Sequence, residues 1–295
     1  MLTSVGQFRP LALLPKKNAC NDIPTETFTL SARVRGAAPG MTLNTATDWK
    51  EDGNFVGANQ ATFSPLTRLD DLPAVLPDNG AEVRETVVLI NGIMTDVAIQ
   101  ASDMQCLANT GRRVIGIHNA TKGLIRDLAQ CLGDKLDLKM ANNRAVDTTA
   151  QLMTQTIEEG KSLHFVGHSQ GGLVISNAVA RVRDHLEAQG LSPAEVKSKL
   201  SLLRITTLGG ASYTYPPGPK YKHCINGFDL VPMAAGMGGV SWLTAGPEDD
   251  IHRFAQVDFP ADMPTVSSGV SNYFARFVDR TTHGPQNIYI PQFGD

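Results

Sequence analysis

Short apolar runs alternate with helical repeats along most of the chain. Four runs have the continuous apolar character of strands covered on both faces, and they span Thr86–Ile90, Arg113–Ile117, Leu163–Val166 and Leu202–Leu208. Apolar residues recur every four positions over 124–136, 145–153 and 174–186, as on one face of a helix. A serine, a proline and a glutamate over 192–195 are typical of another helix start. This alternation predicts an α/β fold, with a mostly parallel central sheet and helices on both faces.

The first 80 residues have a different pattern from the rest. They are richer in Pro, Asn, Thr and Asp, and one stretch, Thr27–Arg35, alternates apolar and polar residues as a half-buried strand does. We expect mostly loop over 41–80. The sequence therefore predicts an N-terminal segment over 1–80, which supplies the first strands of the sheet or an export or accessory region, and a main α/β domain over 81–295.

A G-x-S-x-G pattern lies at Gly167-His168-Ser169-Gln170-Gly171. The bare pattern is weak, because a chain with 27 glycines contains it easily by chance. Its position is more specific, since it follows the strand Leu163–Val166 directly and precedes a predicted helix. A strand, a sharp turn and a helix form the setting of a nucleophile elbow, so Ser169 is the candidate nucleophile.

A serine nucleophile needs a base and a group that orients the base. Asp229 follows the expected strand Tyr221–Ile225 and is the first candidate for the acid, with Asp258 as the alternative. His283, in a turn near the end of the sequence, is the candidate base. His252 is expected to be exposed, His164 to be a buried structural histidine, and Asp249 and Asp250 to lie in a solvated loop.

The loop after the first apolar strand is the second element expected at the site. An oxyanion needs two backbone N–H donors, of which Gln170 would supply one and Ile93 the other, with Met94 as the alternative to Ile93. A mobile apolar cover or a buried packing loop is expected over 231–243. Candidate substrate-binding residues are Asn91, Gly92, His168, Met233, Met237 and Trp242.

Composition and charge narrow the class of protein. The net charge is −3 and the basic residues are scattered, which disfavours a nucleic-acid partner. The sequence has no apolar run long enough to span a bilayer and no motif for a metal or other cofactor, so we expect none of these. The early lysines follow the apolar patch Leu11–Leu14, the reverse of a secretory signal peptide. We expect a cytoplasmic protein, or one exported without a signal peptide by a dedicated secretion system.

The segment 163–172 resembles the nucleophile segment of α/β-hydrolase lipases and esterases. Asn91-Gly92 is similar to their His-Gly oxyanion segment with Asn in place of His, 229–232 to their Asp-x-Val-Pro segment, and His283 with Tyr289 to their C-terminal histidine segment. The resemblance covers about residues 85–290.

The resemblance implies an α/β-hydrolase fold and hydrolysis of a lipid or acyl ester through an acyl-enzyme on Ser169, as in a lipase, phospholipase or esterase. The alternatives are an acyltransferase or thioesterase on the same triad, or a binding protein that keeps the fold without turnover. Without a signal peptide and with an unmatched N-terminal segment, the chain also resembles bacterial lipolytic effectors, and an ordinary intracellular esterase is the alternative.

Overall fold

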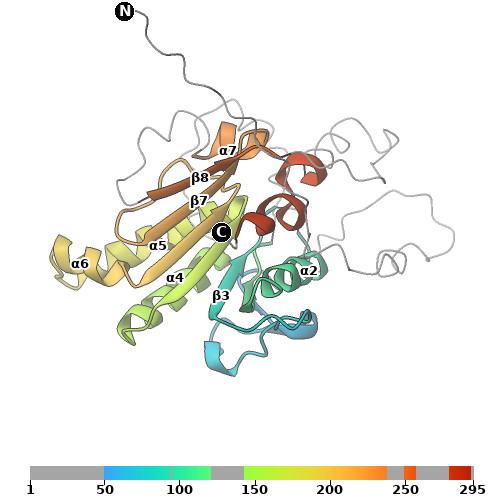
Figure 1. The fold of residues 1–295 in the computed structure, drawn as a ribbon. Helices are drawn as coiled ribbons and strands as arrows, with labels where there is room; N and C mark the ends of the chain where they lie inside the picture. The colour runs from blue at the N-terminus through green and yellow to red at the C-terminus, as the bar shows by residue number, and fades with distance from the viewer. Residues whose placement is uncertain (1–49, 94, 121–142, 238–248, 257–278, 294–295) are drawn as a thin grey trace, which may run out of the picture.

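The strands form one mixed sheet in the computed structural model, which describes residues 50–93, 95–120, 143–237, 249–256 and 279–293 (Figure 1). Their order is β2-β1-β4-β3-β5-β6-β7-β8. The strands from β3 to β8 pair in parallel, and β1 and β2 add an antiparallel edge. The bounds are β1 Phe55–Val56, β2 Thr62–Phe63, β3 Glu85–Ile90, β4 Arg112–Ile117, β5 Leu163–His168, β6 Leu203–Leu208, β7 Lys220–Asn226 and β8 Asp249–Phe254. The expected mostly parallel sheet is confirmed.

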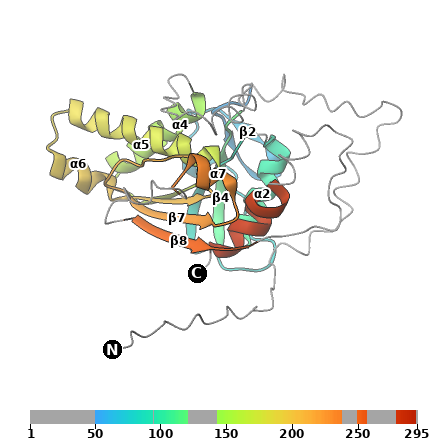
Figure 2. The same ribbon diagram turned by 90° about the horizontal axis from the view of Figure 1, so that it is seen from above.

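Helices cover both faces of this sheet (Figures 1 and 2). One face carries α4, α5 and α6, whereas α2 and the last helical turns lie on the other. The α-helices are α2 Val97–Ala108, α4 Arg144–Glu158, α5 Gln170–Ala188, α6 Pro193–Leu200 and α7 Leu230–Ala235. Shorter helical turns are η2 Ala58–Gln60, η3 Leu69–Asp71, η6 Asp279–His283, η7 Pro285–Tyr289 and η8 Ile290–Gln292.

The two faces follow from the two-residue period of the strands. On β3, Val88 and Ile90 pack into the core under α4 and α5, whereas Val87 and Leu89 pack under α2 and the last turns. Both sides of the strand are therefore apolar, as the sequence predicted. The carboxyl ends of the parallel strands meet along one edge, which is where ligands bind in such sheets.

The structure extends the predicted elements and corrects some of them. α5 and α6 lie where the helical repeats and the capping residues predicted them, and the capping box between Ser192 and Glu195 is present. The predicted helix over 124–136 and strand over 27–35 lie outside the described residues. α2 has no counterpart in the prediction, because buried Gln100 and Asp103 interrupt its apolar face.

Residues 50–80 are mostly loop, as expected for 41–80, but they also contain β1 and β2. Buried Phe55 and Val56 of β1 pair with β4. The expectation of a solvated loop at Asp249 and Asp250 is wrong, because these residues begin β8. Charged residues can lie there because the side chains of an edge strand stay in contact with water. His252 is only partly exposed on the same strand and packs near Phe254.

Candidate active site

Ser169 occupies the sharp turn between β5 and α5. Its backbone lies at φ 52° and ψ −120°, in a region that side-chain-bearing residues rarely adopt and that costs about 1–3 kcal/mol. Surrounding backbone bonds hold it there: its N–H donates to the carbonyl of Leu208 at 3.0 Å, and its carbonyl accepts from Gly172 at 3.0 Å and Ala211 at 2.9 Å. The structure thus has the strand, strained turn and helix that the sequence predicted.

Gly171 lets the start of α5 approach the end of β3. A Cβ atom at this position would lie 2.2 Å from the carbonyl oxygen of Ile90, far inside van der Waals contact. The second glycine of the pattern is therefore required by packing. The close approach also brings the loop after β3 beside Ser169.

Asp229 and His283 meet although they are 54 residues apart in the chain. Nδ1 of His283 lies 2.5 Å from Oδ2 of Asp229, whose side chain is completely buried. Asp229 also caps α7, because its Oδ1 accepts from the N–H of Val231 at 2.9 Å. The hydroxyl of Tyr289 donates to the same Oδ2 at 2.5 Å. The sequence singled out Tyr289 only as part of the resemblance, and nothing local indicated this contact.

His168 connects the elbow to His283. Its Nε2 donates to the carbonyl oxygen of His283 at 2.9 Å, and the two rings lie 4.7 Å apart between centroids. Burial lowers the pKa of His168 to about 3, so the ring is neutral and carries one N–H. His168, expected to bind substrate, is 5% exposed and engaged with the protein. Since His168 directly precedes Ser169, this bond joins the elbow to the backbone of His283.

The loop after β3 lies against the elbow. A Cβ atom at Gly92 would come within 2.9 Å of the Cβ of Ser169. Asn91 is buried, and its side-chain amide donates to the carbonyls of Gly92 at 2.9 Å and Asn119 at 3.0 Å. Ile93 follows in a turn and is partly buried, whereas Met94 lies outside the described residues.

The expected apolar cover is described only in part. Met233 on α7 is 39% exposed and Met237 is buried. Phe228 and Leu230, on either side of Asp229 in the chain, are 57% and 50% exposed. Trp242 and the alternative acid Asp258 lie outside the described residues, as do residues 238–243 of the expected cover.

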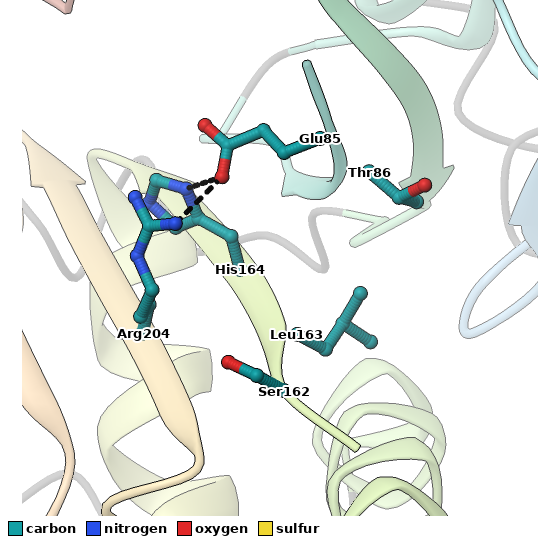
Figure 3. Close-up of a pocket in the computed structure, with 6 residues that line it drawn as sticks. All are labelled: Glu85, Thr86, Ser162, Leu163, His164 and Arg204. Atoms are coloured by element: carbon teal, nitrogen blue, oxygen red, sulfur yellow. Dashed lines mark hydrogen bonds and ion pairs between the residues drawn. The ribbon is translucent and has the colours of Figure 1, made fainter.

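A cluster of charged residues occupies the opposite, amino-terminal edge of the sheet (Figure 3). A cavity of about 290 Å³ there is lined by Glu85, Thr86, Ser162, Leu163, His164 and Arg204. The carboxylate of Glu85 contacts His164 at 3.3 Å and Arg204 at 2.8 Å. The hydrogen bond from His164 is the main reason that the pKa of Glu85 falls to about 2. Glu85, His164 and Arg204 lie at the starts of β3, β5 and β6, whereas Ser169 follows the end of β5, so the cluster lies away from the elbow.

Neither a metal site nor a membrane span is found in the described part of the chain. No three His, Cys, Asp or Glu side chains gather there in a group that could hold a metal ion. Among the same residues, no helix combines the length and the apolar character needed to cross a bilayer.

Comparison with known proteins adds a family match. Residues 82–210 match the family described as "Putative serine esterase (DUF676)", and the matched segment contains both the loop after β3 and the elbow. No curated protein matches the chain.

Similar solved structures include two esterases. An esterase from Pyrobaculum calidifontis is 12% identical, with a TM-score of 0.38 over 59% of this chain and 68% of its own. A bacterial heroin esterase is 15% identical, with a TM-score of 0.39 over 92% of this chain and 94% of its own. These similarities are too distant to transfer a substrate. The mostly parallel sheet, the serine elbow between β5 and α5 and the match to a putative serine esterase family over residues 82–210 together support a serine hydrolase of the α/β-hydrolase superfamily.

Proposed function

We propose that the chain hydrolyses carboxylic esters through an acyl-enzyme on Ser169, with His283 as the base and Asp229 as the group that orients it. The observation that carries the proposal is the contact between Asp229 and His283, together with the bond from His168, the residue before the strained Ser169, to the backbone of His283. A buried carboxylate at Nδ1 fixes the imidazole tautomer that leaves Nε2 ready to accept a proton, and it stabilises the imidazolium that results.

The reaction then runs in two halves. Nε2 of His283 takes the proton of Ser169 as Oγ attacks the carbonyl carbon, and the tetrahedral intermediate collapses with the ester C–O bond broken. The alcohol leaves with the proton from His283. Water next attacks the acyl-enzyme and gives its proton to His283, and that proton returns to Ser169 as the carboxylic acid is released. The backbone N–H groups of Gln170 and Ile93 would stabilise the oxyanion, with Met94 as the alternative to Ile93.

An acyl or lipid substrate is the class that fits the surroundings of Asp229. Phe228, Leu230 and Met233 are large apolar residues exposed next to the acid, and most large apolar side chains elsewhere in the described chain are buried. An apolar acyl chain could contact them and remove them from water, at about 25 cal/mol per Å². We therefore expect longer acyl chains to raise kcat/KM.

Replacement of the nucleophile tests the proposal. Ser169→Ala should lower kcat for a 4-nitrophenyl ester by at least about 10⁴-fold, because the protein cannot form the acyl-enzyme without Oγ. Fluorophosphonate labelling of the wild type at Ser169 should be lost in the same variant. Ser201→Ala is the matched control, since Ser201 lies at the end of α6 and its hydroxyl donates to the carbonyl of Ser198. A folded Ser169→Ala variant with undiminished activity would overturn the proposal.

A further inference from the structure

Asn119 contacts Gln170, the residue after Ser169, although one strand of the sheet lies between them. It follows β4, and in the sheet β3 lies between β4 and β5. Its side chain and backbone are completely shielded from solvent. A buried amide must satisfy its donors and acceptors within the protein, so its partners define its role.

The partners of Asn119 come from three separate segments. Its side-chain Nδ2 donates to Oε1 of Gln170 at 2.9 Å, at the first position of α5. Its Oδ1 accepts from the amide of Asn143, the N-cap of α4, at 3.2 Å. Its backbone forms a pair of bonds with Asn91: the N–H donates to Oδ1 of Asn91 at 2.8 Å, and the carbonyl accepts from Nδ2 at 3.0 Å.

Two of these partners are the segments that would carry the oxyanion donors. Gln170 would supply one N–H itself, and Asn91 precedes the Gly92-Ile93 turn that would supply the other. Stabilisation of an oxyanion depends on donors that are already in place before charge develops. A single residue that holds both segments can set the separation of their N–H groups.

We propose that Asn119 is the positioning residue of the oxyanion site and acts through the side chain of Gln170. The inference rests on the proposed function, since it assigns a support for the same reaction. Asn119 touches neither the substrate nor the reacting atoms in this account. Its loss should therefore weaken stabilisation of the transition state more than binding of the ester.

A double-mutant cycle tests this role. Asn119→Ala and Gln170→Ala should each lower kcat for 4-nitrophenyl butyrate by about tenfold, with KM changed less than about threefold. The double variant should be no more than about threefold below the worse single variant, because both changes remove the same bond. Asn177→Ala is the matched control, since Asn177 on α5 bonds to Leu173 one turn earlier and should keep wild-type kcat.

Several outcomes would overturn the inference. A kcat within twofold of the wild type in either folded single variant would do so, as would strictly multiplicative losses in the double variant. If Asn119→Ala fails to fold, Gln170→Ala decides alone, because it removes the same bond from the opposite side. The proposed function is tested separately: activity retained in Ser169→Ala would remove it, whereas loss there with an unaffected Gln170→Ala would overturn only the role of Asn119.

Discussion

At the scale of single residues, three hydrogen bonds hold the carboxylate of Asp229. Its buried carboxylate accepts from His283 and Tyr289 on one oxygen and from the N–H of Val231 on the other. The hydroxyl of Tyr289 in turn accepts from the N–H of Asn226 at 3.3 Å. A buried carboxylate needs such donors, because an unpaired charge in the interior costs several kcal/mol. Tyr289 therefore both stabilises the fold and holds Asp229 in place for His283.

Removal of the Tyr289 hydroxyl should show how much this group contributes to catalysis and how much to stability. We expect Tyr289→Phe to lower kcat by about tenfold, because a hydrogen bond to a charged group is worth about 1.5–3 kcal/mol. Steady-state kinetics and a thermal melt provide the measurements. Tyr221→Phe is the control, since it loses a 2.6 Å bond to the carbonyl of Pro216. Equal kcat values for the two variants would contradict a role for Tyr289 at the site.

At the scale of elements, the site depends on how closely α5 packs on the end of β3. The contact is made by backbone at Gly171 and the carbonyl of Ile90, which leaves no flexible side chain to yield. The same approach sets the loop at Gly92 against Ser169. Packing of these two elements and the geometry of the elbow are therefore coupled.

A methyl group at Gly171 should damage both stability and activity. Gly171→Ala should reduce the free energy of unfolding by about 2 kcal/mol or more, since backbone must shift to admit the Cβ atom. Urea unfolding and ester hydrolysis measure the two effects. Gly227→Ala, where the new Cβ meets nothing nearer than 3.6 Å, should change stability by less than about 0.5 kcal/mol. Equal stability of the two variants would show that α5 can move without cost.

At the scale of the whole molecule, the sheet contains buried histidines near both the amino-terminal and the carboxyl-terminal ends of its strands. Burial lowers the pKa of His168 to about 3 and of His223 to about 4, and it lowers the pKa of His164 as well. His223 bonds to the hydroxyl of Thr207 at 2.8 Å on the neighbouring strand. These rings are neutral in the folded protein over a range of pH in which the unfolded chain binds protons. The free energy of unfolding therefore depends on pH.

The sign of this linkage predicts sensitivity to acid. Each lowered pKa makes the unfolded state bind more protons below about pH 6.5, so the free energy of unfolding should fall by at least about 1 kcal/mol for each pH unit below 6. Glu85 adds to the loss between about pH 4.5 and 2, because its carboxylate is stabilised only in the folded state. Urea unfolding at constant ionic strength from pH 8 to 4 measures the effect. A constant free energy between pH 7 and 5 would contradict it.

The linear sequence already contained the periodicities of the main elements and the local setting of Ser169. Apolar runs and four-residue repeats mark the faces of strands and helices that become buried, and this periodicity is a local property of each segment. The elbow could be predicted for the same reason, since a strand, the glycine pattern and a helix are contiguous. Asp229 and His283 could be named from chain order and from their place in expected turns, without any indication that they touch.

Contacts between distant segments required the assembled sheet. The order of the strands sets which loops meet at the carboxyl edge, and no local pattern encodes that order. Thus the bonds from Asn119 to Gln170, from Tyr289 to Asp229 and from His168 to His283 join residues separated by 51, 60 and 115 positions. Each bond satisfies a buried polar group whose partner is specified by three-dimensional packing, so these supports of the elbow became visible only in the folded chain.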